Sequence, residues 1–113
     1  MNNRIFVPKA APSISINGHV FELKMSEVDI AQRVLATKAY CTEMLKKEHT
    51  TAQDVISIGR EIESTINDIC GENAMRTMVS GAVVRINEAV ELLTIVEEEA
   101  SNAYMSEMLA KYE

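Results

Sequence analysis

The chain has 113 residues and a mass of 12.6 kDa, which fits one small domain and leaves no room for two. Hydrophobic residues make up 47% and charged residues 25%, which excludes wholesale disorder. No apolar run reaches the roughly 18 residues of a membrane span, and no secretory h-region opens the chain. We therefore expect a cytoplasmic protein in which both cysteines are free thiols.

Acidic residues are concentrated in the last quarter of the chain. The net charge is −6, and residues 86–113 hold seven glutamates against one lysine. Such a surface repels phosphate backbones and anionic membranes, so the sequence predicts neither a nucleic-acid partner nor a membrane partner. Two interpretations of the acidic region stay open: a solvated face, or a docking surface for a basic protein.

Residues 1–12 are predicted to form an N-terminal arm, and residues 13–113 a single domain. Residues 5–7 form a short apolar run, but Pro8 and Pro12 exclude a helix through the segment that follows. The arm is expected either to pair as an edge strand or to remain a mobile tail.

A β-hairpin is predicted directly after the arm. Asn17 and Gly18 lie between two β-prone runs, and this dipeptide accepts the two positive φ angles of a type I′ turn. The turn would pair Ile16 with His19 and place four apolar side chains on one face: Ile14, Ile16, Phe21 and Leu23. Because an isolated hairpin is marginally stable, this face must pack on another element.

Two helices are predicted next, near residues 26–48 and 51–70. Ser26 resembles an N-cap, and Thr51 begins a capping box completed by Gln53 or Asp54. The second helix carries a clear apolar stripe: Val55, Ile58, Ile62, Ile66 and Ile69. Gly71 is expected to close it in a left-handed turn.

One long helix is predicted from residue 73 to residue 112. Apolar residues alternate spacings of four and three from Met75 to Ala103, which is a 3.5-residue repeat. Gly81 is the weak point inside it, and a break near Thr94 or near Ser101 is a further possibility. The expected fold class is α+β, mainly α, with an N-terminal β-hairpin followed by three antiparallel helices, the last one long.

The sequence predicts no catalytic residue, no cofactor and no metal site. His19 and His49 lie about 30 positions apart, and neither stands at metal-ligand spacing from a cysteine. A zinc site built from both histidines with Cys41 and Cys70 is the weaker alternative to two buried thiols. We therefore expect a protein that is not an enzyme.

The order of features resembles a group of small virion-morphogenesis proteins from phages and prophages of Gram-positive bacteria. The similarity rests on the hairpin at residues 14–23 (ISINGHVFEL), the acidic helix start at residues 26–29 and the turn at residues 66–72 (INDICGE). Some of these proteins resemble tail assembly chaperones, which keep the tape-measure protein soluble. The resemblance implies a non-enzymatic assembly factor in the bacterial host, with the tape-measure protein as partner. The alternative is a small regulatory protein that binds a host or phage protein.

The end of the long helix is the predicted interface. From Leu93 onward we expect no element within the chain to cover its apolar stripe: Leu93, Val96, Ala100, Ala103, Tyr104, Met108 and Leu109. These residues predict a homo-oligomer, most simply a dimer. A helix that breaks near Ser101 and folds back onto its own core is the alternative.

Overall fold

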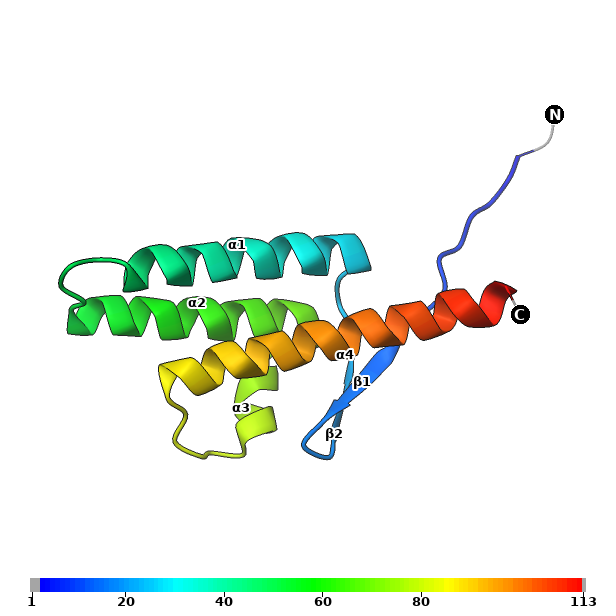
Figure 1. Cartoon of the computed structure of the whole chain (residues 1–113). Helices are drawn as coiled ribbons and strands as arrows, with labels where there is room; N and C mark the ends of the chain where they lie inside the picture. Colours follow the sequence, from blue (N-terminus) through cyan, green and yellow to red (C-terminus); the bar gives the residue numbers. More distant parts are fainter. Residues whose placement is uncertain (1–2, 113) are drawn as a thin grey trace.

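The computed structural model describes residues 3–112 as a two-stranded hairpin followed by four helices (Figure 1). The strands are β1 (Ser13–Ile16) and β2 (His19–Glu22), and the helices are α1 (Glu27–Leu45), α2 (Ala52–Cys70), α3 (Ala74–Val79) and α4 (Ile86–Tyr112). The predicted fold class, α+β and mainly α with a long last helix, is confirmed.

The hairpin forms with the predicted register. Asn17 and Gly18 have φ angles of 52° and 81°, and Ile16 pairs with His19. On the apolar face, Ile14 and Leu23 are buried. The tip is held to the helical part because Asn17 Nδ2 donates a hydrogen bond of 2.8 Å to the carbonyl oxygen of Met78. The hairpin is therefore an integral part of the core.

Replacing Gly18 by valine should destabilise the protein. A β-branched residue at φ 81° is strained, and one such residue costs about 1–3 kcal/mol. Chemical denaturation should show a lower midpoint for Gly18→Val. Val20→Thr is the control, since Val20 is exposed on the outer face and the substitution keeps the β-branch. An equal midpoint for Gly18→Val and the unmodified chain would contradict the turn assignment.

Side-chain caps define where α1 and α2 begin. Ser26 Oγ accepts a hydrogen bond from Asp29 N, as the sequence predicts. At the start of α2, Thr51 Oγ1 accepts from Asp54 N, and Asp54 Oδ2 accepts from Thr51 N at 3.0 Å. The capping box thus uses Asp54 and not Gln53. Asp54 Oδ1 also forms an ion pair with Lys47 Nζ at 3.1 Å.

These contacts make Asp54 a source of pH-dependent stability. The hydrogen bond from Thr51 N, followed by that from Lys47, lowers the pKa of the Asp54 carboxyl. A carboxyl whose pKa is lower in the folded state stabilises the fold above its unfolded pKa of about 4, and this contribution is lost as the pH falls through the folded-state pKa. Asp54→Asn should therefore be less stable than the unmodified chain at pH 7, and the two should converge as the pH falls below the lowered pKa of the folded state. Thermal unfolding followed from pH 7 to pH 2 measures this, and a pH-independent difference would contradict it.

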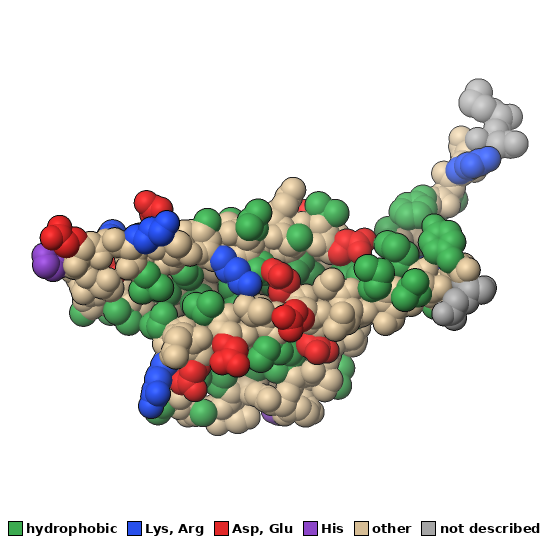
Figure 2. Space-filling view, viewed as in Figure 1, with side chains coloured by type: hydrophobic (Ala, Val, Ile, Leu, Met, Phe, Trp, Pro, Cys, Tyr) green, Lys and Arg blue, Asp and Glu red, His purple; other side chains and the backbone are tan. Residues whose placement is uncertain are grey.

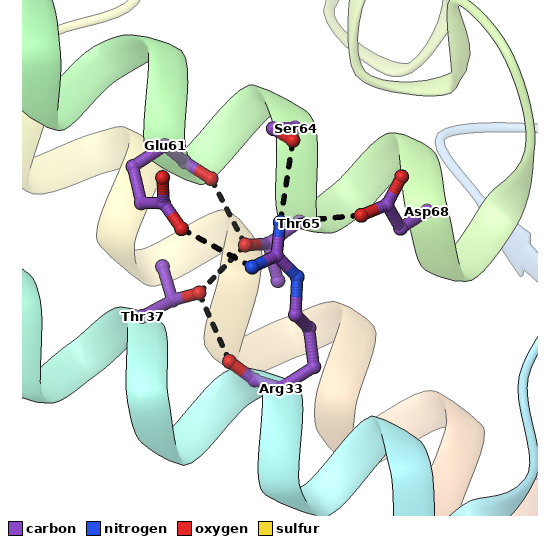
Figure 3. A network of polar contacts seen from close by, with 6 residues as sticks. All are labelled: Arg33, Thr37, Glu61, Ser64, Thr65 and Asp68. Carbon is purple, nitrogen blue, oxygen red and sulfur yellow. Dashed lines mark hydrogen bonds and ion pairs between the residues drawn. The ribbon is translucent and has the colours of Figure 1, made fainter.

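An arginine joins α1 to α2 at the surface (Figure 3). Arg33 Nη1 lies 3.2 Å from Glu61 Oε1, and Arg33 Nη2 lies 3.2 Å from both Ser64 Oγ and Asp68 Oδ2. All three charged side chains retain solvent contact, so each ion pair contributes little to stability. The planar guanidinium does, however, orient the two helices relative to each other.

Two buried threonines fix the same helix pair in the interior. Thr37 Oγ1 and Thr65 Oγ1 lie 2.6 Å apart, and each also lies 2.9 Å from a carbonyl oxygen one turn earlier in its own helix (Figure 3). Three contacts share two hydroxyl hydrogens. One hydroxyl therefore donates within its own helix while the other donates across the interface. This satisfies both buried hydroxyls and sets the register of α1 against α2.

The predicted continuous helix over residues 73–112 is wrong. It is divided into α3 and α4 by a link at residues 80–85, and Ser80 and Gly81 both adopt positive φ angles, of 50° and 76°. The Ser80 backbone N–H closes α3 by donating to the carbonyl oxygens of Arg76 and Thr77. The suggested breaks near Thr94 and Ser101 are also absent, because α4 is continuous from Ile86 to Tyr112.

This break gives α4 its position in the core. After the link, α4 runs back across α1, α2 and β1 (Figure 1). Leu93 and Val96 are fully buried there, and Ala100 is nearly so. The premise that no intrachain element covers the helix from Leu93 onward is therefore wrong for these three residues, which pack inside the chain.

Candidate protein-binding surface

The C-terminal end of α4 extends past the rest of the fold (Figure 1). The molecule measures 63 × 33 × 25 Å, and the 27-residue α4 is expected to span roughly 40 Å. Tyr104 marks where the helix leaves the core, because its hydroxyl donates a hydrogen bond of 2.7 Å to the carbonyl oxygen of Met25.

Beyond this point α4 presents exposed apolar side chains at helical spacing. We define the C-terminal surface by four of them, which are 47–78% exposed: Met105, Met108, Leu109 and Tyr112. Their spacing of i, i+3, i+4 and i+7 places them on one side of the helix. A helix face of this kind is suited to packing against another protein.

Of the seven predicted interface residues, only part belongs to this surface. Met108 and Leu109 are exposed, and Ala103 and Tyr104 are half-buried against the core. Leu93, Val96 and Ala100 lie in the core, as described above. The sequence prediction missed Met105 and Tyr112, although their helical spacing from Met108 and Leu109 was a sufficient signal.

The N-terminal arm contributes a second exposed apolar segment. Ile5, Phe6 and Val7 are 88%, 86% and 76% exposed. The base of the arm is fixed next to the hairpin, because the Pro12 carbonyl accepts a hydrogen bond of 3.0 Å from Leu23 N. The described part of the arm forms no strand, so the edge strand, one of the two predicted alternatives, is not formed there.

The arm and the end of α4 together line a groove of about 580 Å³, which we call the terminal groove. In Figure 2 the apolar side chains of both segments gather at one end of the molecule. The groove is lined by Phe6, Val7, Lys9, Glu27, Tyr104, Glu107, Met108, Lys111 and Tyr112. Burial, followed by the carboxylates of Glu107 and Glu27, raises the pKa of the Tyr104 phenol. The phenol therefore stays protonated at neutral pH, as its hydrogen bond to Met25 requires.

A second groove of about 450 Å³ lies between α1 and α4, and we call it the acidic groove. It is lined by Glu27, Ile30, Ala31, Glu97, Glu98, Ala100, Ser101, Asn102, Tyr104 and Met105. Among residues 3–112, its three glutamates form no ion pair. Figure 2 shows carboxylates gathered along α4 on this face.

The residues considered for chemistry lie apart. Cys41 and Cys70 are buried free thiols. Burial raises the pKa of Cys70 to about 11, and burial, followed by the charge of Glu61, raises that of Cys41. The groove that Cys41 lines contains no histidine. No group of three potential metal ligands from His, Cys, Asp and Glu comes together within residues 3–112.

Comparison of the chain with protein-family models, curated proteins and solved structures finds no significant match. None of the helices that residues 3–112 form combines the length and apolarity needed to cross a membrane.

Proposed function

We propose that this protein is a non-enzymatic assembly factor of a phage or prophage, acting in the bacterial cytoplasm by binding another protein through its C-terminal surface. The observation that carries the proposal is the apolar face of α4 beyond Tyr104, whose four side chains remain 47–78% exposed. The client we propose is the tape-measure protein, as for the tail assembly chaperones that the sequence resembles.

The position of the C-terminal surface supports this kind of activity. Its four apolar side chains project from a helix whose preceding turns are fixed in the core at Val96 and Ala100. A helix held in this way offers a pre-ordered face, so binding of a client does not include the entropic cost of ordering that face. Methionine side chains are flexible, which suits a face that must fit more than one segment of a long client.

Capture of the client from lysates of prophage-induced host cells tests the proposal. The tagged full chain should recover a tail protein, and Met108→Asp with Leu109→Asp should abolish recovery by placing charges on the C-terminal surface. Leu35→Asp is the matched control, because Leu35 is 72% exposed on α1, outside this surface.

Recovery of no tail or capsid protein by the unmodified chain would contradict the proposed function. Recovery of a repressor or a toxin instead would favour the regulatory alternative. Equal recovery of the tail protein by the doubly substituted chain would show that the C-terminal surface is not the binding site.

A further inference from the structure

We propose that the acidic groove receives the N-terminal arm of a second copy, so that two chains associate by exchanging their arms. The inference goes beyond the proposed function, since it concerns the contact of the chain with itself and uses a groove that shares only Met105 with the client-binding C-terminal surface.

The arm has the composition of a segment that becomes buried on association. Three consecutive large apolar side chains, at residues 5–7, are each more than three-quarters exposed. Arg4 and Lys9 flank this run, and neither forms an ion pair among the described residues. An isolated apolar run of this exposure, bounded by two cations, fits a site with an apolar floor and acidic edges.

The acidic groove supplies both features. Ile30, Ala31, Ala100 and Met105 provide apolar lining, while Glu27, Glu97 and Glu98 supply carboxylates without cationic partners among residues 3–112. Placing cations there would relieve the mutual repulsion of the three carboxylates.

The dimensions of arm and groove agree. Five residue steps separate Arg4 from Lys9, which is roughly 17 Å in an extended chain. Eight residues of α4 separate Glu97 from Met105, which is about 12 Å along the helix axis. The two cations of an extended arm can therefore bracket the groove while residues 5–7 cover its floor.

The prolines favour a second copy over the chain's own arm. Pro8 and Pro12 fix their own φ angles and keep Val7 and Ala11 extended, so the arm is stiff near its base. It lines the terminal groove with the end of α4 and from there runs away from the rest of the molecule (Figure 1). Glu97 and Glu98 lie farther back along α4 than the part of the helix that the arm of the same chain lines. To reach them, this stiff segment would have to turn back along α4, whereas a neighbouring copy can accept the arm as it stands. The exchange is reciprocal, so a two-fold dimer forms the contact twice.

Two charge-reversed variants test the exchange. The arm variant carries Arg4→Glu and Lys9→Glu, and the groove variant carries Glu97→Lys and Glu98→Lys. In a dimer of the arm variant, acidic arms meet acidic grooves, and in a dimer of the groove variant, basic arms meet basic grooves. In a mixed dimer of one chain of each variant, both contacts pair opposite charges. Sedimentation equilibrium should show a dimer of twice 12.6 kDa for the unmodified chain. For each variant alone, the dimer dissociation constant should rise about tenfold or more. The equimolar mixture should form dimers again.

Restoration on mixing also shows that neither variant is misfolded. Lys46→Glu with Arg60→Glu is the matched control for two charge reversals outside both grooves, and it should dimerise normally. Met108→Asp with Leu109→Asp should also dimerise normally while losing the client, which separates this inference from the proposed function. A monomeric unmodified chain, a dimer insensitive to both variants, or a mixture that stays monomeric would overturn the exchange.

Discussion

Leu93→Ala is expected to lower the free energy of unfolding by about 3–5 kcal/mol. Leu93 is fully buried, where α4 crosses the other helices and the hairpin. Removing a buried leucine side chain loses its transfer free energy and leaves a cavity that the surrounding helices fill only in part. A loss of this size would remove a large share of the stability of a domain of 113 residues.

Chemical denaturation of Leu93→Ala beside Leu35→Ala gives this prediction a matched control. The same atoms are removed in both variants, but Leu35 is 72% exposed on α1, so its variant should change by less than about 1 kcal/mol. If the Leu93 variant were as stable as the Leu35 variant and instead lost dimer formation, Leu93 would be an interface residue, as the sequence suggests, and its burial in the core would be wrong.

Gly71→Ala is expected to destabilise the protein by about 1–3 kcal/mol, although alanine is the smallest side chain that can be added. Gly71 ends α2 with φ 113° and ψ 166°, a region of backbone conformation that is open essentially to glycine alone. Space is not the obstacle, because an added Cβ would meet Lys24 Cε at an ordinary contact of 3.6 Å. The cost is therefore that of the backbone conformation itself.

Gly59→Ala separates this effect from a general effect of adding a methyl group. Gly59 lies inside α2, and an added Cβ would meet Ile86 Cδ1 at 3.8 Å, which is an ordinary contact. Alanine is favoured over glycine in a helix, so this variant should gain about 1 kcal/mol. Thermal unfolding of both variants should show midpoints that move in opposite directions. A stabilised Gly71→Ala would contradict the backbone geometry assigned to this turn.

Local features of the fold were predictable because local chemistry determines them. The type I′ turn needs only Asn17 and Gly18, and the start of α2 needs only Thr51 and Asp54, so neighbouring residues were sufficient. Gly71 was correctly given a positive φ but wrongly a left-handed ψ, since that angle depends on how the chain continues into α3.

The division of α3 from α4 had no comparable local signal. Apolar spacing continues through the link, although Val83 is 95% exposed there. A single glycine such as Gly81 costs a helix only about 1 kcal/mol, which an apolar repeat can outweigh. The packing of α4 across α1, α2 and β1 favours the break more than the repeat favours one continuous helix. This packing is a property of the whole fold.

The candidate site was predictable only in part for a related reason. A helix face that packs inside a chain and one that packs on a partner have the same periodicity, because both need an apolar stripe. Leu93 and Met108 therefore belong to one pattern, and only the crossing point of α4 with α1 and β1 separates core from surface. That crossing point depends on the break at Ser80, which the repeat conceals.

The packing of β1 against α4 also sets the order of events when the protein is made. The hairpin is translated before the helices, and α4, one of the elements against which it packs, is translated after α1, α2 and α3. A lone hairpin is only marginally stable, so Ile14 and Ile16 cannot be buried as they are in the finished fold until α4 has been synthesised. The apolar residues of the hairpin therefore stay outside the native core until α4 has been synthesised, and this core closes late, when its most distant contacts in sequence form.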